Sequence, residues 1–112
     1  MKRLVFGLTM ATLMTTKALA TAFYTYAQWE DLDPSARSIY IAGAFDSLVG
    51  YAAADGTLHA GLYYHRCLQH VGMSNGRLAE NVREFANKRR RFQKTVQGAL
   101  INYLISFCGK AP

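Results

Sequence analysis

Cysteine and proline are scarce in this 112-residue chain, and charged side chains are few. There are two cysteines and two prolines, which excludes a dense disulfide scaffold of the toxin type and a collagen-like chain. Charged residues make up 18% and hydrophobic residues 51%, so the chain is too apolar for intrinsic disorder. Its length leaves no room for a large multi-part enzyme. What remains is one small, compact domain.

The N-terminal segment has the features of a secretory signal peptide. Lys2 and Arg3 provide a positive start, residues 4–14 form an uncharged apolar run, and Ala18-Leu19-Ala20 places small residues before Thr21. A transmembrane anchor is the alternative, but the run falls short of the ~20 apolar residues that a membrane-spanning helix needs. We therefore expect cleavage after the small residues and no stable membrane anchor.

Cleavage would define the mature chain and its charge. Residues 1–20 are predicted to be the signal peptide, residues 21–112 a single helical domain, and the protein periplasmic. The mature chain keeps ten basic and seven acidic side chains, so the net charge falls from +6 to +3. Residues 21–65 hold one basic and five acidic side chains, whereas residues 66–112 hold nine basic and two acidic ones. An acidic half and a basic half favour protein docking or self-association over nucleic acid binding.

Export also determines how the two cysteines, Cys67 and Cys108, are interpreted. Disulfides persist in oxidising compartments such as the bacterial periplasm, so one bridge is the simplest arrangement. Two free buried thiols, or a catalytic cysteine with a histidine partner, are the alternatives. A bridge would close a loop of about 40 residues, for which the chain-entropy model gives roughly 4 kcal/mol of stabilisation.

The clearest helix is predicted over residues 34–54, where Asp33 is an N-cap residue followed by Pro34 at the first helical position. It has two stripes at helical spacing. The apolar stripe consists of Ile41, Phe45, Leu48 and Ala52. The opposite stripe consists of Ile39, Gly43, Asp46 and Gly50. The second stripe is small enough to let another backbone approach closely, so we expect this helix at the centre of a bundle.

Further helices are expected toward the C-terminus. Ser74 is a candidate N-cap for one helix, and another is predicted over residues 94–108 with Gly109 as its terminator. The apolar face of the first of these helices consists of Leu78, Val82, Phe85 and Ala86. That of the second consists of Val96, Ala99, Leu100, Tyr103, Leu104 and Phe107. Residues 57–71 form either a short helix or an extended arm, and the aromatic segment 21–32 is expected to fold back on the body. No segment of the mature chain alternates with period two for long enough to argue a strand. The predicted fold class is all-α, a small helical bundle of three to four helices stapled by one disulfide.

Short motifs spread over residues 34–108 resemble a known family. They are the run Tyr40-Ile41-Ala42-Gly43-Ala44-Phe45-Asp46-Ser47-Leu48, then Cys67 with Gly72-Met73-Ser74-Asn75-Gly76-Arg77-Leu78, Val82 and Phe85, and lastly Ala99-Leu100 with Phe107-Cys108. This pattern resembles the Tai-type immunity proteins, small exported α-helical proteins that protect bacteria from peptidoglycan amidases delivered by type VI secretion. The resemblance implies a bridge between Cys67 and Cys108. In two places the chain departs from the family: Ser38 stands where a cysteine is expected, and residues 88–91 replace a His-Pro-Glu-like stretch.

Candidates for chemistry are few. His59, His65 and His70 cluster around Cys67, but two histidines five residues apart do not share a helical face, and Cys67 is better used in the bridge. Asp46 is a candidate buried acid, with a solvent-facing position as the alternative. No phosphate-binding glycine loop or nucleophile elbow occurs in the sequence. We therefore predict no enzyme, and no catalytic, cofactor-binding or metal-binding residues.

A basic run is the candidate partner-contact site. It consists of Lys88, Arg89, Arg90 and Arg91. Nucleic acid, an anionic envelope polymer and an acidic protein patch are its candidate ligands, and a solvated helix end is the alternative. Export disfavours nucleic acid, and the nearby Phe85 and Phe92 fit core positions better than stacking platforms. An acidic partner would give salt-sensitive association.

Two classes of function follow. The first is an exported binding protein of the immunity type, which occludes a secreted peptidoglycan amidase with a rigid helical surface. The second is a small periplasmic helical chaperone or envelope-stress protein, whose apolar surface is exposed by acid or partial unfolding. A homodimer is compatible with both, since helical proteins with exposed small-residue or aromatic stripes often dimerise.

Overall fold

The computed structural model describes residues 24–55 and 59–112, and most of these residues are helical. The elements are α1 (Tyr26–Glu30), α2 (Pro34–Asp55), α3 (His59–His70), α4 (Asn75–Asn87), the 3₁₀ turn η1 (Arg90–Phe92) and α5 (Val96–Cys108). Extended pairing within these residues is limited to one isolated bridge between Thr25 and Thr95. The predicted all-α fold with one disulfide is confirmed. The predicted signal peptide lies outside the described residues.

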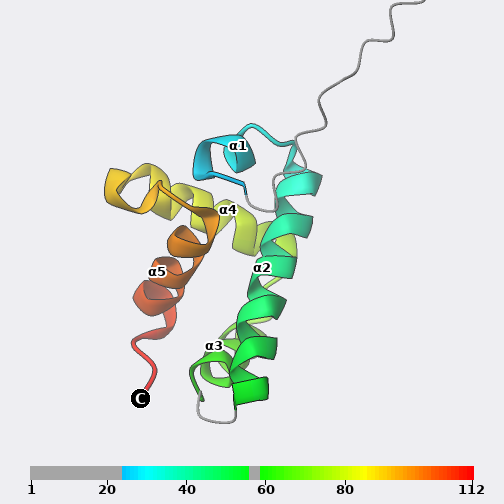
Figure 1. Cartoon of the computed structure of the whole chain (residues 1–112), viewed down its shortest axis with the longest axis vertical. Coiled ribbons are helices and arrows are strands. Elements are labelled where there is room, and N and C mark those ends of the chain that lie inside the picture. The colour runs from blue at the N-terminus through cyan, green and yellow to red at the C-terminus, as the bar shows by residue number, and fades with distance from the viewer. Residues whose placement is uncertain (1–23, 56–58) are drawn as a thin grey trace, which may run out of the picture.

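The longest helix, α2, runs along one side of the molecule (Figure 1). α3 lies beside the C-terminal part of α2, and α4 starts next to α2 and leads away from it (Figure 1). After η1 the chain reverses, and α5 returns toward the level of α3. The sequence is compatible with either a short helix or an extended arm over residues 57–71. The structure has a helix there, α3.

Short polar side chains cap the helices where the sequence predicted it. Asp33 Oδ1 accepts the amide of Ala36 at 2.9 Å, and Ser74 Oγ accepts that of Arg77 at 3.2 Å. These bonds satisfy amides that have no partner in the first turn of a helix. At the C-terminal end of α5, Gly109 has φ +88° and donates its amide to the carbonyl of Ile105. Glycine suits this left-handed backbone, so the predicted terminator is confirmed.

Aromatic residues of α1 lie at the centre of the core. Trp29 and Tyr26 are almost completely buried. The Trp29 indole donates to the Arg37 carbonyl at 3.2 Å, and the Tyr26 hydroxyl donates to Asn87 Oδ1 at 2.8 Å. Both rings bury a large apolar area while their polar atoms keep a partner. The predicted return of the aromatic leader onto the body is therefore confirmed for its described part.

The prediction that α2 packs on both faces at the centre of the bundle is wrong. Ile41 and Phe45 are buried as expected. On the opposite stripe, however, Ile39 is 71% exposed, and no atom lies within 4 Å of a Cβ built on Gly43 or Gly50. The reason is the small number of helices: α3, α4 and α5 all lie on one side of α2 (Figure 1). The described part of the chain has no further helix to cover the outer face.

Replacing Trp29 with alanine should destabilise the protein strongly, because it empties the centre of the core. We expect Trp29→Ala to lower the free energy of unfolding by about 3 to 5 kcal/mol, measured by urea denaturation followed by far-UV circular dichroism. Ile39→Ala is the matched control, since it shortens an exposed side chain and should change the value by less than about 0.5 kcal/mol. Similar losses for the two variants would contradict this description of the core.

Alkaline pH should weaken the fold through Tyr26. Burial raises the pKa of Tyr26 to about 12, and the nearby Glu30 carboxylate adds to this shift. The ordinary tyrosine pKa is 10.0, so the unfolded chain ionises first and stabilisation present below pH 10 is lost as the pH rises toward 12. We expect the free energy of unfolding to fall less steeply over this range in Tyr26→Phe than in the unmodified protein. Equal slopes in urea denaturations at pH 9 to 12 would refute the assignment.

Candidate functional site

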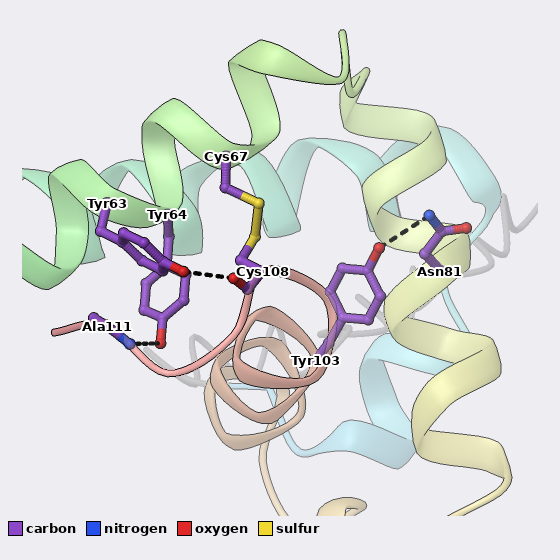
Figure 2. Close-up of a disulfide and its surroundings, with 7 residues drawn as sticks. All are labelled: Tyr63, Tyr64, Cys67, Asn81, Tyr103, Cys108 and Ala111. Atoms are coloured by element: carbon purple, nitrogen blue, oxygen red, sulfur yellow. Dashed lines mark hydrogen bonds between the residues drawn. A yellow bond between two sulfur atoms is a disulfide. The ribbon is translucent and has the colours of Figure 1, made fainter.

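A disulfide and two tyrosines fix the C-terminal end of α5 against α3 (Figure 2). Cys67 and Cys108 are bonded, with their Cα atoms 6.0 Å apart. The Tyr63 hydroxyl donates to the carbonyl of Cys108, and Tyr64 Oη accepts the amide of Ala111 at 3.4 Å. The predicted bridge is confirmed, and both cysteines are consumed by it.

Four aromatic rings form a continuous series across α4, η1 and α5, which we call the aromatic row. In order along the row they are Phe92, Phe85, Tyr103 and Phe107. Their centroids are 5.5, 5.9 and 5.6 Å apart, the outer two contacts stacked and the middle one edge to face. These separations lie in the favourable range for aromatic pairs, about 4.5 to 7 Å.

Tyr103 is the fixed member of the aromatic row. Its hydroxyl accepts a hydrogen bond from Asn81 Nδ2 at 3.1 Å, which joins α5 to α4 (Figure 2). Burial raises the pKa of Tyr103, although the bond from Asn81 opposes this shift. The side chain is therefore neutral at physiological pH. Its hydrogen bond with Asn81 holds the ring in place beside Phe85 and Phe107.

An open groove of about 340 Å³ lies over this row, between α4 and the last turns of α5. Its lining combines aromatic, basic and polar side chains, namely Asn81, Glu84, Phe85, Lys88, Arg89, Tyr103 and Phe107. We call it the α4–α5 groove. Phe107 is 46% exposed and Phe85 is half-buried. The groove thus offers both apolar surface and positive charge to an incoming molecule.

The structure divides the predicted partner-contact run into two parts. Lys88 and Arg89 follow the last turn of α4 and line the α4–α5 groove, whereas Arg90 and Arg91 begin η1. All four side chains are exposed. Cations near a helix C-terminus also interact favourably with the helix dipole, so Lys88 and Arg89 have a structural reason to be here as well.

Two of these guanidinium groups lie over rings of the aromatic row. The Cζ atom of Arg89 is 4.3 Å from the centroid of Phe85, and that of Arg91 is 4.7 Å from the centroid of Phe92. These are cation–π contacts, within the limit of about 6 Å. Each contact restricts an otherwise flexible arginine and covers part of an aromatic face.

This surface is not apparent from the sequence, in which the spacing of these rings favours core positions. Phe107 was expected on the buried face of the last helix, which is wrong, since nearly half of the side chain is exposed. Phe85 and Phe92 are half-buried, and they are stacked on each other. The signal available in the sequence was the four-residue spacing of Tyr103 and Phe107, which places both rings on one helix face.

Of the other candidate side chains, His65 and Asp46 line one hollow, whereas His70 and Cys67 lie outside it. His65 stacks on Phe45 with ring centroids 6.3 Å apart, and Asp46 is exposed at the edge of the same hollow of about 250 Å³. His70 is exposed at the end of α3, and Cys67 is in the disulfide. Over residues 24–55 and 59–112, no group of three or more His, Cys, Asp or Glu residues could hold a metal ion.

The fold and the α4–α5 groove together define a small, disulfide-linked all-α protein with a basic and aromatic surface. No family model, curated protein or solved structure matches the chain. Among its described helices, none combines the length and the hydropathy that crossing a membrane requires.

Loss of the disulfide should destabilise the whole domain, because the bridge closes a 41-residue separation. We expect the double variant Cys67→Ser, Cys108→Ser to lose about 4 kcal/mol of unfolding free energy relative to the oxidised protein, as measured by urea denaturation. Reduced wild-type protein is the control and should behave like the variant. Intact mass with alkylation, with and without reductant, verifies the bond. Free alkylation of both thiols in unreduced protein would contradict the bridge.

Proposed function

We propose that the protein is an exported binding protein of the immunity type, which occludes a secreted peptidoglycan amidase and performs no chemistry of its own. The observation that carries this proposal is the α4–α5 groove, where exposed aromatic surface and basic side chains occur together. Aromatic residues and arginine are enriched in the energetically important parts of protein interfaces. The groove has both, in Phe107, Phe85 and Arg89.

Rigidity supports a role in occlusion. The end of α5 is held by the disulfide and by the Tyr63 and Tyr64 hydrogen bonds, and its middle is joined to α4 through Asn81 and Tyr103. A surface that is ordered before binding pays less entropy when a partner docks. Both walls of the groove meet this condition.

The choice of an amidase as partner comes from the family resemblance. Most of the motif residues shared with the Tai-type immunity proteins build the scaffold: residues 40–48 lie in α2, and Gly72, with φ +63°, turns the chain between α3 and α4. Two motif residues, Phe85 and Phe107, line the α4–α5 groove. Two positions of the resemblance therefore contribute to the candidate surface.

Co-expression with an exported amidase encoded by a neighbouring gene tests the proposal. We expect rescue from amidase toxicity, stoichiometric copurification, and an association rate that falls as salt rises. Lys88→Glu should weaken binding by about tenfold or more, because it places a like charge against an acidic partner. Arg66→Glu is the matched control, since Arg66 is an exposed cation on α3 outside the groove.

Failure to rescue and to copurify would refute the immunity function. Capture of many unrelated unfolded proteins after a shift to acid pH would also contradict it, and would favour the chaperone class. Equal effects of Lys88→Glu and Arg66→Glu would show that only net charge matters and that the groove is not the contact surface.

A further inference from the structure

We infer that the α4–α5 groove receives an apolar segment of the partner protein that carries a carboxylate. An aromatic or aliphatic side chain would lie against Phe107 and Phe85, and the carboxylate of a neighbouring Asp or Glu, or of a chain end, would bind the guanidinium of Arg89. This inference rests on the proposed function, since it names the part of a partner that the same groove would hold.

Phe107 supplies the apolar part of the binding surface. One face of its ring is stacked on Tyr103, which Asn81 fixes in turn, while Phe107 is 46% exposed. Because Cys108 follows directly in the chain and is tied to α3, the backbone carrying Phe107 is also held. An exposed ring on a rigid support gains apolar contact on binding without losing much conformational freedom.

Arg89 supplies the carboxylate contact. Its guanidinium lies over Phe85, and its Nη1 donates to the Phe85 carbonyl at 3.4 Å. Guanidinium has five N–H donors arranged in a planar fork, so most of them remain for another acceptor. In the described part of the chain Arg89 forms no ion pair. A preorganised fork beside an apolar surface matches the geometry of a carboxylate.

The charges around the groove favour a protein segment over a polyanion. Lys88 and Arg89 are balanced in part by Glu84, which lines the same groove. A nucleic acid gains its affinity from many phosphates at once, and here it would meet a carboxylate among the cations. A volume of about 340 Å³ lies at the low end of the range of ligand pockets, about 300 to 1,000 Å³, which suits one or two side chains.

Peptide titration of the disulfide-bonded protein tests the groove without any amidase. The probes are acetyl-Gly-Phe-Asp-Gly-amide, its Asn counterpart, and acetyl-Gly-Phe-Gly with a free C-terminus, each followed by backbone amide shifts in ¹⁵N NMR spectra. We expect millimolar binding with shifts confined to α4, η1 and the end of α5. The Asn peptide should bind about two- to fivefold more weakly than the Asp peptide. The third peptide distinguishes a chain-end carboxylate from a side-chain carboxylate.

Variants separate the two contacts. Arg89→Ala should remove the preference for Asp over Asn, whereas Phe107→Ala should weaken both peptides by about tenfold and keep the preference. Ile39→Ala, which alters an exposed apolar side chain on α2, is the control and should bind like the unmodified protein. Arg89 is exposed, so Arg89→Ala keeps the test decisive even if Phe107→Ala unfolds.

Several results would overturn the inference. These are absence of binding, shifts that lie outside the groove, an Asp preference that survives Arg89→Ala, and tighter groove binding by oligodeoxythymidine than by the Asp peptide at 150 mM salt. An amidase that binds Arg89→Ala and Phe107→Ala as tightly as wild type would overturn it and leave the immunity function standing. If no amidase binds, the immunity function is refuted. The peptide titration then still shows whether the groove binds an apolar segment with a carboxylate.

Discussion

The covalent bond between Cys67 and Cys108 joins α3 to the last residue of α5, and the position of α5 depends on it. α2 packs with α3 and α4, while α5 follows α4 after η1. Without a tie to α3, the free end of α5 would be held mainly by α4. The bridge, reinforced by Tyr63 and Tyr64, closes the chain into one unit. It does so next to Phe107, so the same constraint that stabilises the domain also positions one wall of the α4–α5 groove.

The other wall is held from the opposite side by α1. Asn87, the last residue of α4, accepts a hydrogen bond from Tyr26 and donates to Glu30 Oε1 at 3.1 Å. Arg83 Nε lies 3.4 Å from the same carboxylate oxygen, without the geometry of a hydrogen bond. Partly exposed ion pairs of this kind contribute little free energy. Their effect is on position: these contacts with α1 hold the C-terminal end of α4, which Lys88 and Arg89 follow directly in the chain.

Local signals in the sequence were sufficient for α2, α4, α5 and the bridge, but not for α3, which was left open, or for the surface. Asp33, Ser74 and Gly109 act within one turn of their own positions, so their roles could be predicted without knowing the fold. Which apolar side chains remain exposed depends on how helices cross. Ile39 and Phe107 both occupy stripes at helical spacing, and both are exposed, because no described helix covers the outer face of α2 or the side of α5 that carries Phe107. The pairing of Phe85 with Phe92 likewise depends on the turn at η1.

The arginines over the aromatic row have two roles. They cover aromatic rings in the free protein, and their N–H groups can bind a carboxylate of a partner. In the free protein, the guanidinium groups of Arg89 and Arg91 lie over Phe85 and Phe92, which reduces the aromatic surface left in contact with water. A guanidinium has five N–H donors, and the Nη1 of Arg89 donates to the Phe85 carbonyl, so other N–H groups are left for a further acceptor. The contact with the ring and a bond to a carboxylate can therefore be made by the same side chain. A side chain that is already ordered by the first role loses less entropy in the second, and this makes Arg89 better suited to recognition than a freely mobile lysine would be.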